Sequence, residues 1–189
     1  MTDGDHADRT DAAGPARRSR LDTIRATTRH GLREKATRHA LLPLRVFLGV
    51  TFVYAGIDKL TTSGFFASSG PGSIGGVMET VRDSSAVPWL VDLALKAPEG
   101  FGYAIAIGEL VVGLGTLLGV LARLAACGGA LISLSLWLTV SWQTDPYYYG
   151  NDLVYLMAWL PLVLAGAPAL SVDALRARRR GRDGGPLLG

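Results

Sequence analysis

The stretch FGYAIAIGELVVGLGTLLGVLAR, residues 101–123, is almost entirely apolar, yet it carries one carboxylate, Glu109, close to its middle. A helix of about 20 apolar residues covers the roughly 30 Å hydrocarbon core of a bilayer. An ionisable side chain at the centre of such a helix costs on the order of 2.5–3.5 kcal/mol on insertion scales. The stretch therefore predicts a membrane-spanning helix in which the fold or the function offsets the cost of the carboxylate.

Three more apolar segments accompany this one, at residues 40–60, 124–142 and 153–170. One segment alone would also fit a buried helix of a soluble protein, but four together favour a membrane protein. Short connections predict antiparallel packing, and the glycines in the first three segments allow helix backbones to approach closely. The expected fold class is all-α, a polytopic membrane four-helix bundle.

The distribution of Lys and Arg predicts how this bundle is oriented. Basic residues gather in the two tails and at Arg123, whereas residues 61–99 carry more acidic than basic side chains. By the positive-inside rule, both termini are cytoplasmic, N-in/C-in, and the loops at residues 61–99 and 143–152 face outward. We therefore expect a multi-pass protein in the lipid bilayer of the plasma membrane.

Three regions follow from these patterns: residues 1–39 as a basic, largely disordered cytoplasmic tail, residues 40–173 as the membrane domain, and residues 174–189 as an Arg-rich cytoplasmic tail. Two short amphipathic helices are expected in the first outer loop, resting on the membrane surface. Ser73 is a candidate N-cap for the first, and Pro88 begins the second, which Pro98 ends.

Composition excludes several classes of site. The single cysteine, Cys127, rules out an intrachain disulfide, a CxxC redox pair and a cysteine-rich metal site. All three histidines lie in the N-terminal tail at spacings that do not converge on one helix face, so no metal site is expected. The basic tails lack interleaved aromatic residues and a helix-turn-helix pattern, so no nucleic-acid partner is expected.

Depth counting places the polar residues of the spans in two groups. Asp58, Lys59, Glu109, Asn151 and Asp152 fall in the outer half of the bundle, and Arg45 and Arg123 fall in the inner half. Lys59 is the favoured partner of Glu109, because Arg45 differs from Glu109 in expected depth by roughly 13 Å. A buried pair that only fixes the helix register stays open as an alternative.

The segment SWQTDPYYYGND, residues 141–152, gathers aromatic side chains at the outer mouth of the bundle, with Trp142 and Tyr149 among them. Interfacial aromatic residues anchor most membrane proteins, so an aromatic belt is the default interpretation. The same composition also suits a flat ring with carbonyl groups, such as a quinone headgroup. Pro161 is expected to kink the fourth segment and to open space beside it.

Three stretches of the chain also carry a family resemblance: LRVFLGVTFVYAGIDKL, GELVVGLGTLLGVLARLAA and YYYGNDLVYLMAWLPLVLAGAPALSVD. Their order is similar to that of the DoxX/DoxD family of small four-span membrane proteins, over roughly residues 40–173. The matching positions are Arg45, Gly49, Gly56, Lys59, Glu109, Gly113, Gly119, Arg123, Asn151, Asp152, Gly166, Ser171 and Asp173.

The resemblance implies a membrane subunit linked to quinone chemistry, since DoxD-type members are the small subunit of a thiosulfate:quinone oxidoreductase. It implies quinone as the cofactor, without a metal, haem or flavin motif, and a second oxidoreductase subunit or soluble redox partner as electron donor. The oligomeric state stays open, a homo-oligomer included. Glu109 and Lys59 become the candidate catalytic residues, and the candidate quinone-binding residues are Asp58, Asn151, Asp152, Trp142 and Tyr149.

Two alternatives of other classes accompany this hypothesis. One is a non-catalytic membrane scaffold that anchors soluble redox or stress-response partners through its cytoplasmic tails. The other, a small-solute transporter, is less favoured because the chain lacks an internal inverted repeat and paired broken helices.

Overall fold

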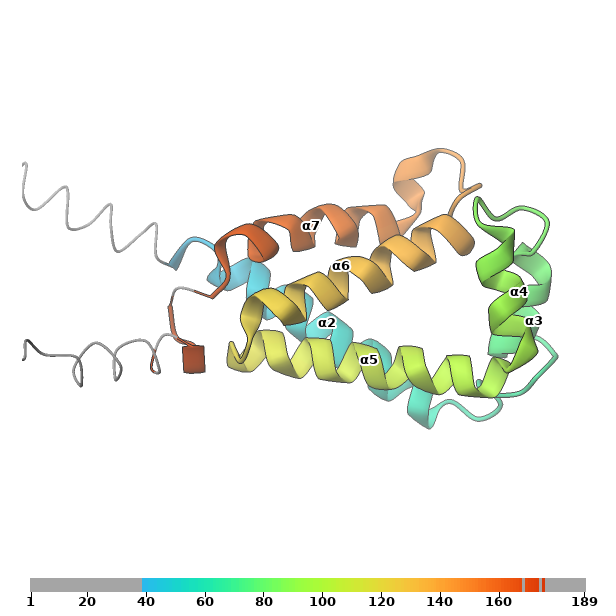
Figure 1. The fold of residues 1–189 in the computed structure, drawn as a ribbon, viewed down its shortest axis with the longest axis horizontal. Helices are drawn as coiled ribbons and strands as arrows, with labels where there is room; N and C mark the ends of the chain where they lie inside the picture. Colours follow the sequence, from blue (N-terminus) through green and yellow to red (C-terminus); the bar gives the residue numbers. More distant parts are fainter. Residues whose placement is uncertain (1–38, 168, 174, 176–189) are drawn as a thin grey trace, which may run out of the picture. The chain divides into compact units, whose positions relative to one another are not determined.

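A computed structural model describes residues 39–167, 169–173 and 175, and the expectations for the two tails lie outside these residues. The described part is all-helical, as predicted, and contains no β-strand. Its elements are α2 (Leu42–Thr61), α3 (Ile74–Val81), α4 (Pro88–Lys96), α5 (Pro98–Leu118), α6 (Ala122–Thr139), the 3-10 helix η1 (Tyr147–Tyr149) and α7 (Asn151–Ala165). Figure 1 shows their order along the chain.

Among the described helices, α5 and α6 are long and apolar enough to cross a membrane. The 20-residue helix α2 is long enough to cross a membrane, but it carries three charged residues, Arg45, Asp58 and Lys59. It is therefore more polar than α5 and α6. The apolar helix α7 has 15 residues, which corresponds to about 22 Å at 1.5 Å per residue. The structure therefore contains two candidate membrane-spanning helices, with α2 and α7 beside them.

The predicted end of the fourth apolar segment, at residue 170, is wrong. Helix α7 ends at Ala165, because Gly166 adopts a φ of 69° and a ψ of −150°, which a continuing helix does not allow. Hydropathy does not reveal the end of the helix, because residues 167–170 are still mostly apolar. Pro161 lies inside α7, and the helix continues through it to Ala165.

Helix α5 begins three residues before the predicted boundary, with Pro98 in its first turn, where the missing N–H costs nothing. It ends at Gly119, whose φ of 65° is left-handed and whose N–H reaches the carbonyls of Gly115 and Thr116. This is the usual way for glycine to end a helix, and it turns the chain directly into α6.

The two predicted short helices are present as α3 and α4. The Ser73 hydroxyl accepts a hydrogen bond from the N–H of Gly76 at 3.1 Å, so the expected N-cap of α3 is confirmed. The two helices lie side by side and contact α5 (Figure 1). Their shared core consists of Ile74, Met78, Val91 and Ala94.

The long helices pack chiefly as two pairs, α2 with α5 and α6 with α7, and α5 also contacts α6 (Figure 1). Glycines permit both pairings. A Cβ at Gly56 would lie 2.7 Å from the Ala106 carbonyl oxygen, and one at Gly113 would lie 2.7 Å from the Val53 nitrogen. A Cβ at Gly129 would overlap the Trp159 ring. The bundle core is formed by Leu48, Phe52, Val112, Ala126, Trp159 and Leu162.

Candidate functional site

The carboxylate in the middle of α5 is paired with a lysine from the end of α2. The Lys59 Nζ donates to Glu109 Oε1 at 2.9 Å and to Oε2 at 2.8 Å. The side chain of Glu109 is 4% exposed and that of Lys59 is 22% exposed. The predicted preference for Lys59 over Arg45 as the partner of Glu109 is therefore confirmed.

The glycine contact between α2 and α5 brings this pair together. Gly56 lies one turn before Lys59, and it packs against the backbone of Ala106 and the side chain of Leu110, on either side of Glu109. A larger residue at position 56 would push the helices apart at the level of the pair. The Lys59 Nζ also lies 3.5 Å from the Ala55 carbonyl oxygen, so its side chain bends back along α2.

A third charged residue, Asp152, joins the pair from the first turn of α7. Asp152 lies near enough to Lys59 and Glu109 for charge interactions with both, without a direct hydrogen bond or ion pair to either. Ser141 follows the end of α6, and its hydroxyl donates a hydrogen bond to Asp152 Oδ2. Gly150 permits this approach, because a Cβ there would lie 3.2 Å from the Ser141 Cβ. We refer to Lys59, Glu109 and Asp152 as the charged cluster.

The sequence prediction missed Ser141. A serine at the end of an apolar segment carries no signal that distinguishes it from other interfacial serines. Only the path of the chain between α6 and α7 brings its hydroxyl to Asp152.

The charged cluster combines one ammonium with two carboxylates, so it holds one formal negative charge when all three groups are ionised. Charges of like sign repel strongly where water is scarce. Uptake of one proton makes the cluster neutral. The arrangement is therefore chemically able to accept and release a proton.

Four of the predicted site residues do not enter the charged cluster. Asp58 and Asn151 are exposed. Trp142 is 47% exposed and packs against Trp137, with ring centroids 5.3 Å apart. Tyr149 is 69% exposed and packs against Tyr148, with centroids 5.0 Å apart. Each of the two rings therefore packs against a neighbouring aromatic ring of its own segment.

Arg45 has a different partner from Glu109. Its Nη1 and Nη2 donate to the carbonyls of Ala169 and Leu170, each at 2.7 Å. Arg45 as a whole is 5% exposed, and its guanidinium thus holds residues 169–173, which we call the post-α7 segment. Of the other charged positions that carry the family resemblance, Lys59, Glu109 and Asp152 form the charged cluster, and Arg123 donates to the Leu164 carbonyl at 3.0 Å.

The post-α7 segment also caps α6. The Asp173 carboxylate accepts hydrogen bonds from the N–H groups of Leu121 at 3.2 Å and Ala122 at 2.9 Å. A carboxylate at a helix N-terminus satisfies free N–H groups and interacts favourably with the helix dipole. The Asp173 N–H in turn donates to the Gly119 carbonyl at 3.1 Å. The segment therefore ties the start of α2 to the turn between α5 and α6.

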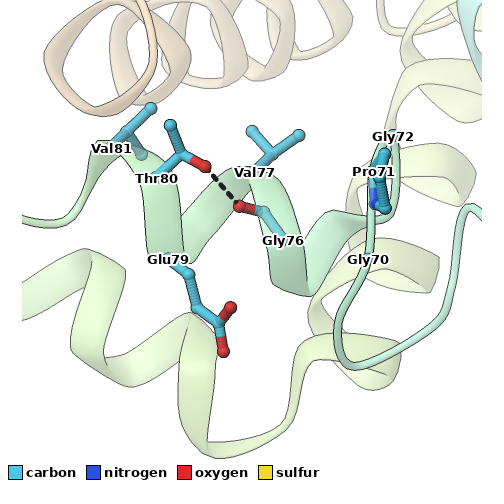
Figure 2. A pocket seen from close by; sticks show the side chains of 8 residues that line it. All are labelled: Gly70, Pro71, Gly72, Gly76, Val77, Glu79, Thr80 and Val81. Carbon is cyan, nitrogen blue, oxygen red and sulfur yellow. Dashed lines mark hydrogen bonds between the residues drawn. The ribbon is translucent and has the colours of Figure 1, made fainter.

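Two depressions open at the surface around the first loop. One, of about 530 Å³, is lined by Gly70, Pro71, Gly72, Gly76, Val77, Glu79, Thr80 and Val81. Figure 2 shows Glu79 pointing to the opposite side of α3 from Val77 and Thr80. The other, of about 460 Å³, lies beside the start of α5 and includes Glu99 and Tyr103. Neither contains a residue of the charged cluster.

Comparison with known families gives one result. The family model described as DoxX matches residues 40–142, more than half of the 189-residue chain, from α2 through α6. The match includes Lys59 and Glu109, and Asp152 follows it. Comparisons with curated proteins and with solved structures give no match. The chain belongs to the DoxX family of membrane-associated proteins.

Proposed function

We propose that this chain is an integral membrane subunit of a quinone-linked oxidoreductase, in which the charged cluster forms the polar, proton-handling wall of a quinone site. The observation that carries the proposal is the burial of a lysine–glutamate pair, joined by a second carboxylate, among apolar helices. The family membership supports the membrane setting and the link to oxidoreductases. The DoxD-like subtype is part of the proposal.

The apolar outer surfaces of the long helices support the proposal that four helices, α2, α5, α6 and α7, span the membrane. Large apolar side chains point outward from all four helices, among them Phe47, Val50, Val111, Leu118, Leu124, Leu131, Met157 and Leu164. A protein in water rarely exposes apolar surface on this scale, whereas lipid tails cover it without penalty. The charge bias of the tails and loops supports cytoplasmic termini in the plasma membrane, with the charged cluster in the outer half.

Stability alone does not account for the charged cluster. Replacing a buried ion pair with apolar residues of similar volume is often neutral or stabilising. Ionisable residues inside membrane segments instead tend to mark proton relays and ligand sites. A packing pair would also need no second carboxylate, yet Asp152 adds one.

The hydrogen-bonding groups suit a quinone, whose two carbonyl oxygens accept hydrogen bonds. Lys59 offers an ammonium group that can donate to one of them. Reduction of a quinone to a quinol takes up two electrons and two protons. Glu109 and Asp152 would hold the protons, Lys59 would orient Glu109, and a separate redox subunit or soluble partner would supply the electrons.

The test is photolabelling of the purified full-length chain in detergent with a photoreactive quinone analogue, mapped by mass spectrometry. We expect saturable labelling of α2, α5 or α7 beside the charged cluster, and a large loss of labelling in both Glu109→Gln and Lys59→Met. Arg82→Gln is the matched control, because its exposed pair with Asp92 lies in the first loop.

Size-exclusion chromatography and circular dichroism establish that each variant is folded before it is labelled. Absence of saturable labelling in the folded wild-type protein would overturn the proposal. The scaffold hypothesis, in which the tails recruit redox or stress-response partners, would then take first place.

A further inference from the structure

The charged cluster lies asymmetrically between the two ends of the long helices. Lys59 is two residues from the end of α2, and Asp152 is the second residue of α7. Asp152 is half-buried, and the preceding Asn151 is exposed. From this end, which also carries α3 and α4, the cluster is within reach of water.

The bundle core separates the cluster from the other end. Val112 lies one turn beyond Glu109, and Phe52 and Trp159 lie seven residues, about 10 Å, from Lys59 and Asp152 respectively. The rings of Phe52 and Trp159 pack edge to face with centroids 4.9 Å apart. Thr116, two residues from the end of α5, has a buried hydroxyl with no hydrogen-bond partner among the described residues, so it continues no polar chain from Glu109.

The charged groups on the neighbouring elements leave the cluster isolated. Arg45 lies at the opposite end of α2 and bonds to backbone carbonyls, and Arg123 lies at the opposite end of α6. On the outer side, the charged residues of α3 and α4 are Glu79, Asp92 and Lys96. Glu79 and Lys96 are exposed and Asp92 is bonded to Arg82, while Asp58 of α2 and Glu99 of α5 are exposed as well. Among the described residues, Lys59 and Asp152 are therefore the charged groups that interact with Glu109.

We infer that the charged cluster exchanges protons with one side of the membrane only, the side that carries α3 and α4, and that Asp152 is the group through which the proton passes. A proton leaves water and forms an O–H bond with an Asp152 carboxylate oxygen. It then passes to the Glu109 carboxylate, which becomes a carboxylic acid, while Asp152 is again ionised and Lys59 remains an ammonium. The Ser141 hydroxyl positions Asp152 for this step by its hydrogen bond to Oδ2.

This inference rests on the membrane setting of the proposed function, but not on quinone. Its test uses the full chain in lipid vesicles with inner and outer pH set independently, and orientation determined by protease access to the N-terminal tail. The probe is dicyclohexylcarbodiimide, which reacts with protonated carboxyl groups in apolar surroundings. Labelling of Glu109 is mapped by mass spectrometry, and Glu109→Gln identifies the signal.

We expect Glu109 labelling to follow the pH on the α3–α4 side, by up to about tenfold per pH unit where the group titrates, and to ignore the pH on the other side. Asp152→Asn and Ser141→Ala should slow the response to a pH step by about tenfold or more. Ser141→Thr should restore the rate, because it restores the hydroxyl. Asp83→Asn, an exposed change of the same kind on the same side, should leave the rate as in the wild type.

Labelling that follows the opposite side, follows both sides equally or is absent at every pH would overturn the inference. So would a folded Asp152→Asn variant that responds at the wild-type rate. If Asp152→Asn fails to fold, the comparison of Ser141→Ala with Ser141→Thr decides. Because no quinone is present, a protein that binds no quinone can still show one-sided exchange, and the two proposals therefore fail separately.

Discussion

The Lys59 ammonium lies 2.9 and 2.8 Å from the two carboxylate oxygens of Glu109, so the one carboxylate in the middle of α5 is held by a cation from the end of α2. The side chains of helical residues lean toward the N-terminus of their helix, which explains how a lysine near the end of α2 reaches back toward its middle. The pairing places an ammonium where it neutralises Glu109.

Removing either member of the pair should destabilise the protein. Glu109→Gln leaves the Lys59 charge without its partner, and Lys59→Met leaves the Glu109 carboxylate buried and unpaired. Breaking a buried pair in this way costs about 3–5 kcal/mol. Thermal unfolding in detergent measures the loss, with Arg82→Gln in the exposed loop pair as a control that should change little. Single variants as stable as the control would show that Lys59 and Glu109 are not effectively buried.

A methyl group at Gly129 should destabilise the contact between α6 and α7. A Cβ there overlaps the Trp159 ring, and overpacking of this kind costs about 1–3 kcal/mol. Gly100→Ala is the matched control in α5, because no heavy atom lies within 4 Å of its Cβ position. The free energy of unfolding of the control should rise by about 0.5–1 kcal/mol, because alanine favours the helix more than glycine does. Equal unfolding temperatures for the two variants would contradict the observed packing.

Arg45→Lys should release the post-α7 segment even though it keeps the positive charge. The guanidinium reaches two consecutive carbonyls with two nitrogens, and a lysine ammonium cannot reproduce this fork. Hydrogen exchange measured by mass spectrometry should accelerate in peptides covering residues 169–173. Peptides from α4 serve as the internal reference and should not change. Unchanged protection of the post-α7 segment would mean that the Arg45 hydrogen bonds do not hold it.

Part of this site could be predicted from the sequence, because depth along a helix is a simple function of residue number. Counting from the helix ends placed Lys59 and Asp152 near the depth of Glu109, and Arg45 roughly 13 Å from it. The Ser73 cap and the close glycine contacts were predictable for the same reason, since each depends on local spacing. Membership of the DoxX family was likewise recognisable from charged residues and glycines in order.

Other features depend on where the chain goes between helices, which residue spacing does not encode. Helix α7 ends at Ala165 because of the backbone angles of Gly166, although the apolar composition continues beyond it. Arg45 donates to the carbonyls of Ala169 and Leu170 only because the chain after α7 returns to the start of α2. The loop path also sets the exposure of Trp142, which is 47%, and of Tyr149, which is 69%.

The most direct test of the central claim is quinone-analogue photolabelling of the double variant Lys59→Met/Glu109→Met. Apolar side chains of similar length should replace the buried pair without loss of stability, or with a gain, so the fold is retained while the chemistry is removed. We expect a double variant that is as stable as the wild type and has lost saturable labelling. A stable double variant that is labelled as strongly as the wild type would contradict it, and would make Lys59 and Glu109 a pair that only fixes the register of α2 against α5.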